Sequence, residues 1–61
     1  MSMTLSLIKQ HRIALIPEYD GVWHAEFYGD QEQPQFKGTG DTPYQAVRDV
    51  MEKAKTAGEV Q

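Results

Sequence analysis

His24 and Glu26 are the residues whose types and spacing come nearest to acid–base chemistry. They stand two positions apart in a stretch that is typical of a strand, and alternate strand residues share a face. General acid–base catalysis requires a positioned constellation, and no nucleophile or third orienting group occurs near this pair. We therefore predict that the chain has no catalytic residues and that His24 is a surface or interface histidine.

Metal and phosphate chemistry are also not expected. The chain has no cysteine, and its two histidines, His11 and His24, match no standard metal-binding spacing. Gly38, Thr39 and Gly40 resemble half of a phosphate-binding loop, but an acidic residue and no lysine follows. We predict no metal and no cofactor, and we interpret His11 as a solvated residue at the start of a strand.

Length and charge limit the function classes. The 61 residues form one domain, 1–61, with a lead-in over residues 1–10. The formal net charge of −3 argues against nucleic-acid binding, which requires a basic face, and favours a basic protein partner. No apolar run approaches the ~20 residues of a membrane helix, and no signal peptide is evident. We expect a cytoplasmic protein with no membrane contact.

Two strands and the loop between them define a hairpin. Residues 11–17 and 22–28 have strand-like composition. A two-residue Asp20–Gly21 turn would mix Glu18 into the apolar face, whereas a three-residue loop over 19–21 makes one face wholly apolar. The three-residue loop is our prediction. It places on one face Ile13, Leu15, Pro17, Trp23, Ala25 and Phe27, and we interpret Trp23 as a core residue.

The remaining segments complete a sheet and one helix. Residues 35–38 predict a short third strand, and residues 3–8 alternate weakly, as a short strand or an ordered lead-in would. Thr42 and Gln45 form a capping box around Pro43, which predicts a helix over 43–57. Its apolar stripe is Ala46, Val47, Val50, Met51 and Ala54. We expect surface pairs between Arg48 and Glu52 and between Asp49 and Lys53, a helix stop at Gly58, and a frayed tail over 58–61.

These elements predict an α+β fold, a three-stranded antiparallel sheet packed on one C-terminal helix. One helix covers one face only, so the opposite face is available for contacts. A chain this small, without disulfides, gains most from burying that face, and we expect a homodimer. The partner-interface candidates are Ala14, Ile16, Tyr19, Val22, His24, Glu26 and Tyr28.

Two segments carry a resemblance to a known family. Residues 13–27 (IALIPEYDGVWHAEF) and 38–47 (GTGDTPYQAV) resemble the opening hairpin, third strand and helix start of HicB-like proteins. The resemblance spans roughly residues 12–55. It implies a β-β-β-α domain, related in shape to double-stranded-RNA-binding domains, that acts as an antitoxin by binding a small RNA-cleaving toxin of the HicA type.

The sequence departs from that family at two places. Residues 29–34 (GDQEQP) replace a Pro-x-Leu-Pro-Gly-Cys-type step, and no DNA-binding segment is expected after Gln61. Double-stranded RNA is not expected as a ligand either, because the helix start at 41–45 has no lysine or arginine. The function expected is a small protein-binding regulatory module. The alternative is a ligand-sensing or enzymatic domain that uses His24 and Glu26.

Overall fold

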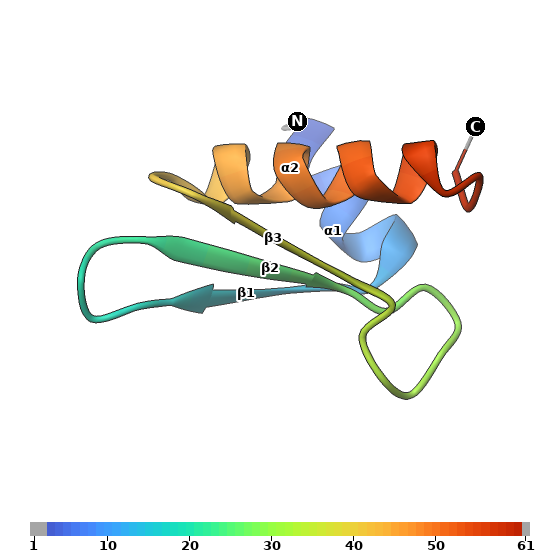
Figure 1. Ribbon diagram of the computed structural model, residues 1–61, viewed down its shortest axis with the longest axis horizontal. Helices are drawn as coiled ribbons and strands as arrows, with labels where there is room; N and C mark the ends of the chain where they lie inside the picture. Colours follow the sequence, from blue (N-terminus) through green and yellow to red (C-terminus); the bar gives the residue numbers. More distant parts are fainter. Residues whose placement is uncertain (1–2, 61) are drawn as a thin grey trace.

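The computed structural model describes residues 3–60 and has the order helix, three strands, helix. The sheet is antiparallel with strand order β1-β2-β3, and both helices lie on one side of it (Figure 1). The α+β class and the β-β-β-α order are those predicted from the sequence. The additional element is the N-terminal helix α1.

Helix α1, Met3–His11, rules out a short strand over residues 3–8 and leaves the other alternative, an ordered lead-in, which is helical. Leu7 and Ile8 turn toward the domain and pack against its core, whereas Leu5 is 62% exposed. The weak alternation of apolar residues is thus not a strand pattern, because only part of it faces the protein. The chain reverses at Arg12, whose φ of 55° lies in the left-handed region.

His11 also differs from expectation. It is half-buried at the end of α1, and its ring stacks on Phe27 with centroids 5.3 Å apart. Phe36 meets the same phenylalanine edge-on at 5.7 Å. The histidine predicted to be solvated is therefore part of an aromatic cluster at one end of the core.

The hairpin of β1, Ile13–Pro17, and β2, Trp23–Phe27, has the predicted register. Ile13 pairs with Phe27 and Pro17 with Trp23, and the Glu18 amide donates to the Val22 carbonyl at 2.8 Å across the loop. Gly21 has a φ of 89°, as a three-residue loop requires. The apolar face predicted from this register contributes the buried Ile13, Ala25 and Phe27, with Leu15 and Trp23 partly buried against them.

Strand β3, Phe36–Gly40, is longer than the predicted 35–38 and pairs with β2. Two of its glycines let helix α2 approach closely. A Cβ added at Gly38 would lie 2.6 Å from the Val50 amide nitrogen, and one at Gly40 would lie 2.5 Å from that of Ala46. Helix α2 therefore lies mainly over β3 and β2.

Helix α2, Pro43–Thr56, begins as predicted. The Thr42 hydroxyl accepts from the Gln45 amide at 3.1 Å, while the Gln45 side chain accepts from the amide of Asp41 rather than from that of the cap residue. All five predicted stripe residues are buried. The Asp49–Lys53 pair forms at 3.4 Å, and no ion pair joins Arg48 to Glu52 in the described chain.

The end of α2 is more ordered than a frayed tail. Gly58, with φ of 81°, donates to the Lys55 carbonyl, and Glu59 donates to that of Ala54, which together make a Schellman cap. Val60 then packs against the core. Gln61, the last residue of the expected tail, lies outside the described residues.

No helix within residues 3–60 is both long and apolar enough to cross a membrane.

Candidate functional site

The face of the sheet opposite the helices is the surface that the sequence marked as an interface, and we call it the outer face. The register aligns its side chains in two rows across the strands. One row is Ala14, Glu26 and Lys37, and the other is Ile16, His24 and Thr39. Four of the seven predicted interface residues thus lie in adjacent positions, and β3 adds two that the sequence prediction omitted.

His24 does not pair with Glu26 as its sequence position suggested. Its Nε2 lies 3.6 Å from a carboxylate oxygen of Glu18, which follows β1. Both side chains are well exposed, at 39% and 48%, so an ion pair between them is worth little and would require a protonated imidazole. His24 and Glu18 therefore form a solvent-exposed contact between an imidazole and a carboxylate beside Ile16.

Glu26 is held by a different partner. The Tyr28 hydroxyl donates to a Glu26 carboxylate oxygen at 3.2 Å. The pKa of Tyr28 is raised by desolvation and by the nearby Glu26 carboxylate, while Arg12 opposes the rise. The phenol therefore keeps its proton across the physiological range. Arg12 lies 5.9 Å from the centroid of the Tyr28 ring, which extends the cluster to the end of β1.

The other predicted interface residues lie at the ends of this surface. Val22 precedes β2 and is half-buried, and its amide donates to the Asp20 carboxylate at 3.1 Å. Tyr19 stands apart at the hairpin tip, fully exposed. The structure therefore brings Ala14, Ile16, His24 and Glu26 together, flanks them with Val22 and Tyr28, and leaves Tyr19 as a projecting aromatic side chain.

Side chains of α2 cap part of the free edge of β3. The Thr39 amide donates to the Asp49 carboxylate at 2.9 Å, and the Lys53 ammonium donates to the Lys37 carbonyl at 2.7 Å. The hydrogen bond from Thr39, aided by Lys53, lowers the pKa of Asp49. The Asp49–Lys53 pair, predicted as an exposed surface pair, therefore occupies two of the four outward backbone groups of Lys37 and Thr39.

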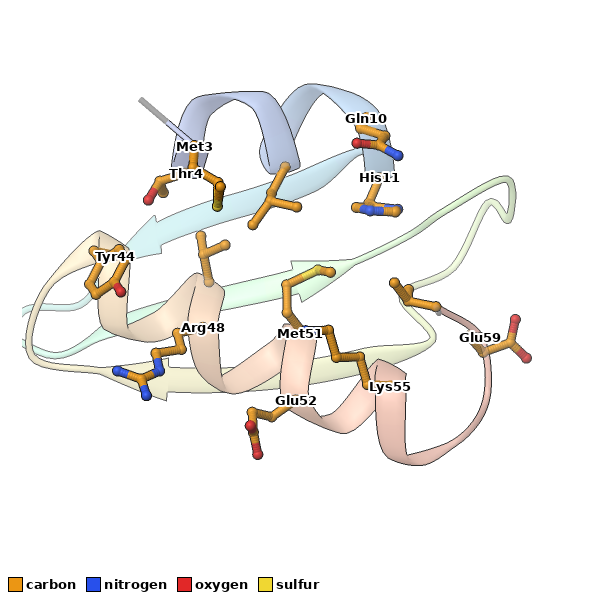
Figure 2. A pocket seen from close by; sticks show the side chains of 13 residues that line it. Met3, Thr4, Gln10, His11, Tyr44, Arg48, Met51, Glu52, Lys55 and Glu59 are labelled. Atoms are coloured by element: carbon orange, nitrogen blue, oxygen red, sulfur yellow. The ribbon is translucent and has the colours of Figure 1, made fainter. Parts of the chain in front are cut away.

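A groove lies between the two helices, on the side of the sheet opposite the outer face (Figure 2). It has a volume of about 790 Å³, and Met51 points into it between α1 and α2, whereas Arg48 and Glu52 point away from α1. Leu7, Val47 and Val60 supply apolar lining, and Gln10 and His11 supply polar groups from α1. Sequence reasoning missed this groove because it did not predict α1.

Within residues 3–60, no group of three or more histidine or acidic residues is placed to hold a metal ion. Comparisons with protein-family models, curated proteins and solved structures found no match to the chain.

Proposed function

We propose that this chain is a small protein-binding regulatory module, similar to a HicB-like antitoxin, that engages a basic protein through its outer face. The observation that carries the proposal is that both helices lie on the other side of the sheet, so no element within residues 3–60 covers this face (Figure 1). Ile16 is 38% exposed at its centre, and such a residue gains from burial against a partner.

The charge around Ile16 favours a basic partner. Glu18 and Glu26 contribute carboxylates to the outer face, and Asp20 adds another at the hairpin. Arg12, whose guanidinium donates to the backbone carbonyls of Gly29 and Gln31 at 3.2 Å each, and Lys37 carry positive charge farther from the hairpin, so the carboxylates prevail at the hairpin end of this face. Complementary charge of this kind steers association and selects partners more than it adds affinity. A toxin of the HicA type is the partner that the family resemblance implies.

The alternative, a ligand-sensing or enzymatic domain built on His24 and Glu26, receives less support. Glu26 accepts a hydrogen bond from Tyr28, and His24 lies beside Glu18, so the two residues do not act on one another. The groove between the helices is not lined by either residue.

Affinity capture from native lysate tests the proposal. The wild-type chain should retain a basic protein in stoichiometric amount, and Ile16→Glu should lose it because a charge replaces the apolar centre. Glu52→Ala, on the far side of the domain, is the matched control and should retain the partner. Retention of the same protein by Ile16→Glu, or of RNA in place of a protein, would contradict the proposal.

Self-association would use the same face and would therefore compete with the basic partner for Ile16. A homodimer would bury Ile16 against its symmetry mate, and sedimentation at tens of micromolar measures this directly. We expect a mass of two chains for the wild type and one for folded Ile16→Glu. A wild-type mass of one chain would remove the homodimer and leave the outer face to the basic partner.

A further inference from the structure

The direction of the backbone groups of β1 follows from the bonds that flank it. The Tyr28 amide donates to the Arg12 carbonyl at 3.2 Å, and the Glu18 amide donates to the Val22 carbonyl at 2.8 Å. Hydrogen-bonded pairs alternate along an antiparallel ladder, so Ala14 and Ile16 also exchange their bonds with β2. The backbone groups of the odd-numbered residues Ile13, Leu15 and Pro17 therefore point away from the sheet.

Those outward groups have no partner in the described chain. No side chain in residues 3–60 donates to or accepts from the backbone of Ile13, Leu15 or Pro17, in contrast to the capped edge of β3. Pro17 has no N–H, so the edge presents two donors and three acceptors. An unpaired strand edge of this kind is a template for another extended chain.

Helix α1 supplies an apolar surface on the helix side of the free β1 edge. Helices pack about 8–10 Å apart and strands only about 4.8 Å, so α1, beside α2, overhangs the free side of β1. Leu5, 62% exposed, precedes Ile8 by one helical turn on the side of α1 away from the groove. A strand added to β1 would contact Leu5 on one face and lie beside Ile16 on the other.

The same overhang disfavours a second copy of this chain at this edge. Two β1 strands paired about a two-fold axis would lie about 4.8 Å apart, while their two α1 helices would need about 8–10 Å. A segment without its own covering helix meets no such conflict. Glu18 and Asp20 lie at one end of the edge and favour basic residues there.

We propose that the free edge of β1 binds an extended segment of a partner protein as a fourth, antiparallel strand of four to five residues, apolar at its centre and basic at the end that lies beside Glu18 and Asp20. The inference rests on the proposed protein-binding function and specifies how a partner is held. Backbone hydrogen bonds to Ile13 and Leu15 supply the pairing, and Leu5 and Ile16 select apolar side chains.

A synthetic peptide tests this without knowledge of the natural partner. The probe is a capped peptide of alternating valine and threonine with lysine at its N-terminal end, which antiparallel pairing places beside Glu18. Its control has the same side chains but is N-methylated at every central backbone nitrogen, which removes its donors. With the first peptide at millimolar concentration, amide exchange measured by nuclear magnetic resonance should slow by at least about tenfold at Ile13 and Leu15. With the methylated peptide, exchange at these two amides should not change. Equal effects of the two peptides, or no slowing at these amides, would overturn the proposal.

Leu15→Pro compared with Leu15→Ala tests the protein side. Both remove the leucine side chain, but only proline removes the outward N–H, and it leaves the bonds to β2 intact. Leu15→Pro should lose peptide binding that Leu15→Ala retains, and if the proline variant does not fold, the methylated peptide decides alone. Thr39→Lys changes the outer face on β3, two strands away from this edge, and should keep peptide binding. If that variant loses the lysate partner, the proposed function of the outer face stands. If the wild type also fails to bind the peptide, the edge inference is overturned.

Discussion

The two edges of the sheet are finished in different ways. Along β3, Asp49 and Lys53 of α2 bond to the outward groups of Thr39 and Lys37 at 2.9 and 2.7 Å. Along β1, the described chain supplies no such bonds, and α1 only overhangs the edge. Natural proteins usually block free strand edges to prevent unwanted pairing. The open edge of β1 is the one to which the proposed fourth strand would add.

The difference follows from how closely each helix approaches its strand. Gly38 and Gly40 bring α2 onto β3, so side chains one turn apart reach the strand backbone. Helix α1 is joined to β1 through the left-handed Arg12, and its Leu7 and Ile8 pack against the core. The predictions below act on the β3 side, where the contacts that close the edge are defined.

The largest effect is expected from Gly38→Ala. Its Cβ would lie 2.6 Å from the Val50 nitrogen and 3.0 Å from the Ala46 carbonyl oxygen, both in the helix backbone, so α2 must move away from β3. Overpacking of this kind lowers the free energy of unfolding by about 1–3 kcal/mol, and we expect the upper end. Gly21→Ala is the control, since open space surrounds that position and only its φ of 89° opposes alanine. Chemical denaturation measures both, and equal losses would show that close approach of α2 is not what distinguishes β3.

Asp49→Ala should open the β3 edge directly. It removes the acceptor of the Thr39 amide and the ion pair with Lys53, and we expect a loss of about 1 kcal/mol because the carboxylate is 39% exposed. Glu52→Ala changes a neighbouring acid of the same helix that caps nothing, and should stay within about 0.5 kcal/mol of wild type. Faster exchange of the Thr39 amide in Asp49→Ala alone is the second measurement. Unchanged exchange would mean that the edge is protected by something other than Asp49.

Some parts of this fold were predictable from local sequence patterns, and others depend on contacts between elements that are distant in the sequence. The hairpin register was predictable because only one loop length makes the face of Ile13 and Phe27 wholly apolar, and the start of α2 because Thr42, Pro43 and Gln45 are local signals. Helix α1 was not predictable in the same way, since its inward residues include Thr4 and His11 and its exposed ones include Leu5. The capping role of Asp49 depends on the distance between a helix and a strand, which no local pattern contains.

Thr42→Ala should lower the free energy of unfolding by as much as Asp49→Ala or less, because Thr42 fixes where α2 begins along β3. The hydroxyl satisfies the Gln45 amide at 3.1 Å and fixes where the helix starts, and loss of such a cap costs about 1 kcal/mol. Thr56→Ala, which removes a hydroxyl bond to the Glu52 carbonyl near the other end of α2, should cost less. Thermal unfolding compares the two variants. A melting temperature unchanged by Thr42→Ala would count against its role as the cap.

The smallest effect is the pH dependence of the closed edge. The pKa of Asp49 is lowered from its ordinary value of 3.8, first by the hydrogen bond from Thr39 and then by Lys53. A lowered pKa in the folded state means that the unfolded chain binds the proton more readily, so the stabilisation is full above 3.8 and is lost as the pH falls through the folded value. The difference in unfolding free energy between wild type and Asp49→Asn should therefore be constant from neutral pH down to mildly acidic pH. It should shrink only below the ordinary value. Because both proteins share every other titrating group, a difference that already changes between pH 6 and 8 would assign the closure of the β3 edge to a group other than this carboxylate.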